Sequence, residues 1–205
     1  NIDDQSVTAM WHRERFLRIT CSSRAHRIKT RKSNFEKLAI SFLKQQFKAT
    51  PVPAMRYGLA MESRAKEKFT ELTGYFVDDV GLVISKQQPF LACSPDGIVF
   101  DGDSYELLEV KCPYTCEGSV IVDFEKRESK VKYLVFDKAG VLQLKKNDIY
   151  YTQIQVSMYI LNVRVCNFFL YSSADFTSPH SFFCVCFHFL FKTFNKLIHK
   201  TITLV

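Results

Sequence analysis

The sequence predicts a single domain of the α/β class, built as an α+β sandwich. Its 205 residues are 47% apolar and 24% charged, which suits one domain with a full hydrophobic core. Apolar residues recur at helical spacing before residue 74, and short segments rich in β-branched and aromatic residues follow up to residue 110. A helix and a strand come after them. This order of elements is typical of helices packed on a sheet.

The first expected elements are two helices. Over residues 35–47 the apolar residues fall on one side of a helix, and Ser33 or Asn34 is suited to the N-cap. A second helix is expected over residues 54–72, ending at Gly74, because glycine adopts the left-handed C-terminal position at no steric cost. The apolar set of this helix includes Met55, Leu59, Ala65 and Phe69.

A cluster of short strands is expected next, since these segments are rich in β-branched and aromatic residues and are separated by turn residues. The clearest turns are Ser94-Pro95-Asp96-Gly97 and Asp101-Gly102-Asp103. The expected strands are 76–84, 90–93, 98–100 and 105–110.

A short helix is expected at 119–126, followed by a hairpin around the turn residues 137–140. The second half of the chain then predicts a helix from Asn147 to about Leu161 and a final core strand at 164–171. The hairpin strands are expected at 132–136 and 141–144. One face of the helix is expected to hold Ile149, Gln153, Val156 and Ile160.

The end of the chain differs in composition from the rest. After Asp175 there is no acidic residue, and seven of the nineteen phenylalanines lie between Phe176 and Phe194. The run 181–191 is too short to span a bilayer and is compatible with a buried strand, a buried helix or an interfacial segment. We expect the domain to cover residues 1–175, and the Phe-rich tail, residues 176–205, to be atypical of it.

The positive charge is concentrated at one end of the chain. Residues 1–50 hold eleven Lys or Arg and four acidic residues, whereas the remaining residues hold seventeen of each sign. The net charge of +7 therefore belongs to this basic segment. Such a distribution is typical of a surface that meets a nucleic acid or another phosphate polymer, although a solvated basic helix or arm gives the same pattern.

The constellation with the most chemical content joins Asp96 to Glu109-Val110-Lys111. Because side chains alternate along a strand, Glu109 and Lys111 point to one face and Val110 points to the other. Two carboxylates and an ammonium group thereby converge. The carboxylates, together with the Val110 carbonyl, are hard oxygen ligands that suit Mg²⁺ or Mn²⁺. The alternative is an ordinary hairpin with a surface Glu and Lys pair.

These residues carry a family resemblance. Pro95-Asp96 with Glu109-Val110-Lys111 matches the PD-(D/E)xK nuclease signature. More narrowly, four blocks between about Trp11 and Tyr171 resemble the YqaJ-like viral recombinase family, the phage lambda exonuclease branch of that superfamily. This resemblance implies a restriction-endonuclease-like core, with a central mixed sheet flanked by helices. The blocks are Trp11-His12-Arg13-Glu14-Arg15 with Ile19-Thr20-Cys21-Ser22; Gly58-Leu59-Ala60-Met61-Glu62; Cys93-Ser94-Pro95-Asp96-Gly97 with Leu108-Glu109-Val110-Lys111-Cys112-Pro113; and Tyr151-Thr152-Gln153-Ile154-Gln155-Val156-Ser157-Met158.

The resemblance implies a role for each matching residue. Lys111 resembles the catalytic lysine, and Gln153 the glutamine that a late helix presents to the active site. The expected metal ligands are Asp96, Glu109, the carbonyl of Val110 and, directly or through water, Glu62. The expected contacts to the phosphate of a DNA end are Arg15 and Ser22.

Several of these residues have a structural alternative. Glu62 lies four residues before Lys66, so the two are spaced to form a surface ion pair on a helix. Gln153 and Gln155 cannot both face the sheet from one helix, so at most one belongs to the site. The alternative role of Arg15 is as part of the basic face, and the alternative role of Ser22 is as a helix cap.

Cysteine and histidine offer a competing zinc hypothesis that the sequence supports poorly. Cys112 and Cys116 are separated by three residues, and Cys184, Cys186 and His188 could supply three ligands, but a structural zinc site needs four well-placed ligands. Seven cysteines without a framework spacing favour reduced thiols and an intracellular protein, with nucleus and cytoplasm left open. The alternating residues Cys184, Cys186 and His188 suit a buried strand equally well.

The sequence and the resemblance together predict a Mg²⁺-dependent deoxyribonuclease that hydrolyses phosphodiester bonds. The resemblance implies an exonuclease that acts from the 5′ end on linear duplex DNA, in recombination or repair. It also implies a homotrimer and a single-strand annealing partner. A catalytically inactive DNA-binding domain on the same fold is the alternative. A membrane-surface protein is a third possibility, and the basic segment and the Phe-rich tail are the only features that favour it.

Overall fold

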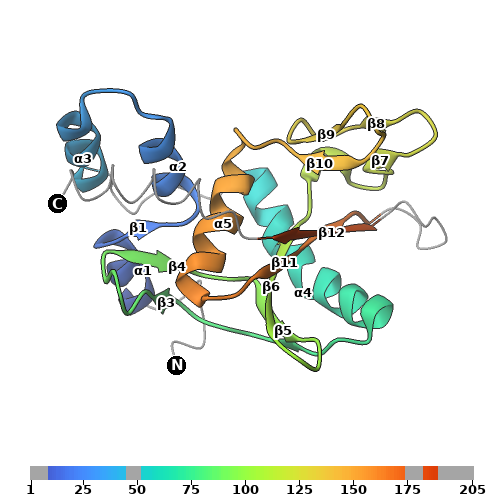
Figure 1. Ribbon diagram of the computed structural model, residues 1–205, viewed down its shortest axis with the longest axis horizontal. Coiled ribbons are helices and arrows are strands. Elements are labelled where there is room, and N and C mark those ends of the chain that lie inside the picture. The colour runs from blue at the N-terminus through green and yellow to red at the C-terminus, as the bar shows by residue number, and fades with distance from the viewer. Residues whose placement is uncertain (1–8, 45–51, 174–181, 189–205) are drawn as a thin grey trace.

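The chain folds around one mixed sheet. The computed structural model describes residues 9–44, 52–173 and 182–188, the last range as backbone only. The five strands of the central sheet lie in the order β12 (Phe182–His188), β11 (Val165–Tyr171), β6 (Tyr105–Lys111), β5 (Gly97–Phe100) and β2 (Val77–Asp78). Strand β6 runs parallel to β11 and antiparallel to β5, so the sheet is mixed. Helix α5 (Ile149–Leu161) packs on one face and helix α4 (Pro53–Thr73) on the other (Figure 1). The predicted fold class is confirmed.

The remaining elements form two smaller units. The N-terminal helices lie with a three-stranded sheet on the outer side of α5 (Figure 1). The segment between β6 and α5 forms two short hairpins. The first unit contains α1 (Ala9–Phe16), β1 (Ile19–Thr20), α2 (Ser23–Thr30), α3 (Phe35–Leu43), β3 (Val83–Ile84) and β4 (Leu91–Cys93). The second contains the 3-10 turn η1 (Tyr114–Cys116), β7 (Val122–Asp123), β8 (Glu128–Ser129), β9 (Leu134–Phe136) and β10 (Leu142–Leu144).

Alternation along β6 divides its side chains between the two faces of the sheet. Leu107 packs in the core under α5, whereas Leu108 and Val110 pack in the core under α4. Glu109 shares the face of Leu107 and therefore points toward α5, where Gln153 contacts it. The strand thus carries core residues along its length and catalytic residue types at its C-terminal end.

Helix α4 has nearly its predicted bounds, but its apolar face is corrected. It ends at Thr73, and Gly74 follows with a φ of 74°, as the sequence predicts. Ala65 and Phe69 are buried against the sheet, whereas Met55 and Leu59 are 61% and 64% exposed. The face that meets the sheet is a stripe with a spacing of four residues, and Met55 and Leu59 lie well to the side of this stripe.

Two predicted elements are wrong. The single strand expected at 76–84 is two strands in different sheets, because Val77–Asp78 pairs with β5 and Val83–Ile84 pairs with β4. The helix expected at 119–126 is absent. Instead, Val122–Asp123 pairs with Glu128–Ser129, and the Asp123 carboxylate accepts a hydrogen bond from the backbone of Lys126 at 2.9 Å. This local side-chain bond stabilises a turn in place of a helix.

Helix α5 is buried on more sides than its sequence pattern predicts. Its N-cap is Asp148, whose side chain accepts a hydrogen bond from the Tyr150 backbone N–H, one residue after the expected start at Asn147. Ile154 and Met158 pack on the central sheet, and Val156 packs on the smaller sheet. The helix lies between two sheets, so the expected single apolar face, Ile149, Gln153, Val156 and Ile160, is incomplete.

The other elements agree with the sequence to different degrees. Helix α3 begins after Asn34, which takes the N-cap position without a side-chain hydrogen bond, and it ends at Leu43; residues 45–47 lie outside the described chain. The hairpin of β9 and β10 and the strand β11 are confirmed. Helices α1 and α2 were not predicted. Within the Phe-rich tail, the backbone of β12 pairs antiparallel with β11. The domain boundary at residue 175 stays a prediction.

Replacing Phe169 with alanine is expected to lower the free energy of unfolding by about 3–5 kcal/mol. Phe169 is buried in the core under α4, and its ring meets that of Phe69 at 5.4 Å in a T-shaped contact. Urea unfolding monitored by circular dichroism measures the change. Phe76→Ala is the control, because Phe76 is 74% exposed and its loss should cost under about 0.5 kcal/mol. Equal losses in both variants would contradict the assigned core.

Candidate active site

The turn before β5 brings Asp96 to the end of β6. In the antiparallel β5–β6 pairing Gly97 lies opposite Leu108, so Asp96, one residue earlier, lies beside the residues of β6 that follow Leu108. The Asp96 carboxylate accepts a hydrogen bond from the Val110 backbone N–H at 2.8 Å. Gly97 is required here, because a Cβ atom would lie 2.5 Å from the side chain of Val77. Close approach of three strands therefore fixes the position of the Asp96 carboxylate.

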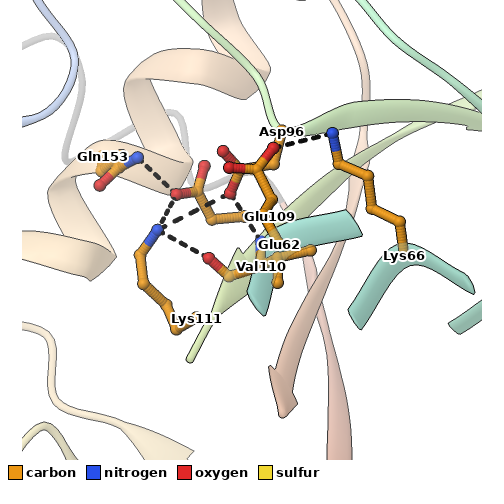
Figure 2. A network of polar contacts seen from close by, with 7 residues as sticks. All are labelled: Glu62, Lys66, Asp96, Glu109, Val110, Lys111 and Gln153. Atoms are coloured by element: carbon orange, nitrogen blue, oxygen red, sulfur yellow. Dashed lines mark hydrogen bonds and ion pairs between the residues drawn. The ribbon is translucent and has the colours of Figure 1, made fainter. Parts of the chain in front are cut away.

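Lys111 and Gln153 meet at Glu109. The Lys111 ammonium group forms an ion pair with Glu109 Oε1, lies 3.8 Å from Asp96 Oδ2, and donates to the Val110 carbonyl at 3.0 Å. Gln153 Nε2 donates to the same Glu109 oxygen (Figure 2). The structure thus brings five sequence-predicted site residues together. Gln155 is also buried, and of the two glutamines Gln153 is the one whose contact with Glu109 is described.

The Glu109 carboxyl group is the electrostatic centre of this cluster. Its side chain is fully buried, and burial raises its pKa above the ordinary value, helped by the charges of Asp96 and Glu62 and opposed by Lys111. Burial alone would lower the pKa of Lys111, but the carboxylates of Glu109 and Asp96 outweigh it and raise that pKa. A further positive charge beside Glu109 would favour its ionised form.

The oxygen donors of this cluster fit a divalent cation. Among the described residues, no three His, Cys, Asp or Glu side chains form a ready-made metal cluster. Glu109 Oε2 is nevertheless buried and has no hydrogen-bond partner in the described part of the chain, beside the partly exposed Asp96 carboxylate. An unpartnered buried carboxylate oxygen is costly, and a cation would satisfy it. The oxygen donors Asp96, Glu109 and the Val110 carbonyl suit a hard ion such as Mg²⁺.

Glu62 approaches the same cluster from α4. Its carboxylate forms an ion pair with Lys66 at 2.8 Å, as the helical spacing indicated. Its charge also raises the pKa of Glu109, so it faces the site as well (Figure 2). The two interpretations of Glu62 are therefore compatible. The sequence indicated the pair of Glu62 and Lys66 but not the second partner of Lys66, Asp79, because that contact joins segments that no local pattern connects.

Arg15 connects the basic segment to the turn that carries Asp96. Its guanidinium group donates to the Ser94 hydroxyl at 2.9 Å and lies 4.3 Å from the centre of the Trp11 ring. Burial lowers the pKa of Arg15. Ser22 takes the N-cap position of α2 without a side-chain cap bond, and its hydroxyl lies 3.5 Å from that of Thr20. Ser94, which adjoins Pro95-Asp96, is a polar residue outside the set of predicted site residues.

The alternatives to a carboxylate site gain no support from the described residues. Cys112 and Cys116 are free thiols, and burial raises the pKa of Cys112 to about 12. The side chains of Cys184, Cys186 and His188 lie outside the described part of the chain. No helix among the described residues is long and apolar enough to cross a membrane.

The fold is similar to those of solved exonucleases. The alkaline exonuclease LHK-Exo of Laribacter hongkongensis, in complex with dAMP, matches with a TM-score of 0.66 at 22% identity, over 96% of this chain and 90% of that one. A phage-related exonuclease of Haemophilus somnus 129PT matches with a TM-score of 0.62 at 11% identity, over 92% of each chain. The shutoff and exonuclease protein SOX of Kaposi's sarcoma-associated herpesvirus, in an RNA complex, matches with a TM-score of 0.64 at 13% identity, over 98% of this chain and 70% of that one.

The sequence itself places the chain in a family. No curated protein matches it. The family model of the YqaJ-like viral recombinase domain matches residues 10–164, which is most of the chain and includes every predicted site residue. This chain belongs to the YqaJ-like viral recombinase domain family.

Proposed function

We propose that this chain is a divalent-metal-dependent nuclease that hydrolyses the phosphodiester bonds of DNA. The observation that carries the proposal is the buried Glu109 carboxyl group, held among Asp96, Lys111 and Gln153, with one oxygen that has no partner among the residues the structure describes. Membership of the YqaJ-like family and a fold shared with exonucleases support it.

Each residue of the cluster has a chemical task in this proposal. Asp96, Glu109 and the Val110 carbonyl would hold the cation, with Glu62 at its side. A bound divalent cation supplies neutralisation of the charge that develops on the phosphate and lowers the pKa of a bound water. Lys111 lies beside both carboxylates and can hold the attacking water or a phosphate oxygen. Gln153 fixes the Glu109 carboxylate through its donated hydrogen bond.

The basic segment would bind the nucleic acid. Arg15 already reaches the turn of Asp96 through Ser94, so a phosphate bound by Arg15 would lie next to the catalytic cluster. Ser22 would add a hydroxyl contact. The exonuclease neighbours support attack at a strand end. Action on linear duplex DNA from the 5′ end, in recombination or repair, is proposed on family resemblance. A trimer and a single-strand annealing partner are proposed on family resemblance.

The inactive DNA-binding domain is less well supported, because every expected acidic, lysine and glutamine residue is present at the cluster.

RNA is a second candidate substrate, since SOX was solved with RNA as well as with DNA. Competition between labelled duplex DNA and RNA of equal length distinguishes the two substrates.

Incubation with linear duplex DNA labelled at the 5′ or the 3′ end tests the proposal. We expect shortening in Mg²⁺ and none in EDTA, and release of the 5′ label as mononucleotide gives the polarity. Binding in EDTA is expected to weaken steeply with salt, because phosphate contacts release counterions. A folded chain that binds this DNA and never cuts it would leave the inactive binding domain as the function.

A further inference from the structure

A second ammonium group, that of Lys66, lies at the candidate site. Lys66 Nζ lies 2.8 Å from Glu62 Oε1 and 2.8 Å from Asp79 Oδ1, so it bridges the two carboxylates. Its side chain is only 19% exposed, whereas that of Asp79 is 84% exposed. Figure 2 shows Lys66 on the far side of the carboxylates from Lys111.

We propose that Lys66, itself held by Asp79, is a positioning residue that orients the Glu62 carboxylate toward the cation site of Asp96 and Glu109. The inference rests on the proposed function, because it gives a metal-directed task to Glu62. It adds two residues, Lys66 and Asp79, whose contribution acts entirely through Glu62.

The two partners of Lys66 are held by the same packing that builds the site. Helix α4 is anchored on the sheet by Ala65 and Phe69, which flank Lys66 in the sequence. Asp79 directly follows β2, which pairs with β5 and packs closely on Gly97, where a Cβ atom would lie 2.5 Å from the Val77 side chain. The strand that fixes the Asp96 turn therefore also places the carboxylate that holds Lys66.

The charges at the site explain why an oriented cation is useful there. Among the described ion pairs, Glu62, Asp79, Asp96 and Glu109 have two cationic partners, Lys66 and Lys111, so the six groups carry a net charge of −2 when all are ionised. One divalent cation would neutralise this charge. Burial acts to lower the pKa of Lys66, but its two ion pairs outweigh burial and raise it, so Lys66 stays charged.

The ion pair with Lys66 also gives the two oxygens of the Glu62 carboxylate different roles. Because the ammonium group binds Oε1, Oε2 is the oxygen left to a cation or to its water. Without Lys66 the long Glu62 side chain would regain rotamer freedom and would meet the charges of Asp96 and Glu109 without compensation. Groups that orient a metal ligand in this way commonly change metal affinity by about 10–100-fold.

The same helix offers a matched control. Lys68 pairs with Glu71 at 2.8 Å, and its side chain is 20% exposed, close to the 19% of Lys66. This pair has no contact with the catalytic carboxylates among the interactions described, so it reports what an ordinary helical ion pair contributes. Lys68→Met therefore controls for the loss of one lysine and of one helical ion pair on α4.

Binding of Mn²⁺ to the full chain, followed by electron paramagnetic resonance of the free ion, tests the inference without any need for cleavage. We expect Lys66→Met to weaken Mn²⁺ binding by about 10-fold. Asp79→Asn should weaken it in the same direction, and Lys66→Arg should recover most of the affinity. Lys68→Met should bind Mn²⁺ as the parent does. Unchanged binding in Lys66→Met would overturn the inference, and tighter binding would show that Lys66 competes with the cation.

A double variant separates an effect through Glu62 from a general loss of structure. In the Glu62→Gln background, Lys66→Met should cause no further loss of Mn²⁺ affinity, because the two residues act as one unit. An additive loss, or an altered circular dichroism spectrum, would contradict the positioning role. A parent chain that binds no Mn²⁺ would overturn the proposed function and this inference together. A parent that binds Mn²⁺ equally well with and without Lys66 would overturn the inference alone.

Discussion

Glu109→Gln is expected to reduce metal-dependent cleavage by at least about 10³-fold while the chain stays folded. Cation binding supplies several kcal/mol of transition-state stabilisation, and each 1.36 kcal/mol corresponds to a factor of ten in rate. The substitution removes the negative charge and keeps the shape. The amide oxygen can still accept the hydrogen bond from Gln153 in the buried site. Initial rates on end-labelled duplex DNA in saturating Mg²⁺ measure the effect.

Glu106→Gln is the matched control for this result. Glu106 is also a buried carboxylate on β6, but it lies on the opposite face of the strand and accepts a hydrogen bond from Asn167 at 2.6 Å. Its substitution should leave cleavage within about a factor of ten of the parent. If Glu109→Gln also cleaves within that range, the assignment of Glu109 as a metal ligand is wrong.

Lys111→Ala is expected to slow cleavage by about 10²–10³-fold with little loss of DNA binding, a range typical of removing one charged or hydrogen-bonding group from a transition state. The ammonium group contacts Glu109 and Asp96 at the point where the phosphate would react. DNA binding in EDTA should keep nearly its salt dependence, because a single phosphate contact changes the slope by about one at most. Single-turnover cleavage and a salt titration of binding measure the two effects separately.

Stability is the complication in Lys111→Ala, and it is measured alongside the rate. Removing one partner of a buried ion pair typically costs about 3–5 kcal/mol, although Glu109 can take up a proton to reduce that cost. Thermal unfolding therefore accompanies the kinetics, and the assay is run well below the unfolding temperature. Lys86→Ala, at an exposed lysine in the connection after β3, should change neither rate nor binding. A folded Lys111→Ala chain that cuts at the parent rate would remove Lys111 from the mechanism.

Parts of the fold follow from local sequence and were predicted correctly. Helix α4 ends where Gly74 permits a left-handed residue, and the hairpin of β9 and β10 surrounds its predicted turn. The errors occur where distant segments decide the outcome. The segment 76–84 divides because its two halves find partners in different sheets. The segment 119–126 forms a short strand and a turn in place of a helix, because the Asp123 side chain stabilises the turn.

For the candidate site, the sequence by itself determined the residue types, their spacing and the strand alternation that sets Glu109 and Lys111 on one face. These features are local, since they depend on backbone geometry over a few residues. Only the tertiary structure decided that Glu62 pairs with Lys66 while facing Glu109, that Gln153 contacts Glu109, and that Asp79 holds Lys66. Those contacts depend on how α4, α5 and β2 pack against β6, and packing between elements distant in sequence leaves no periodic pattern along the chain.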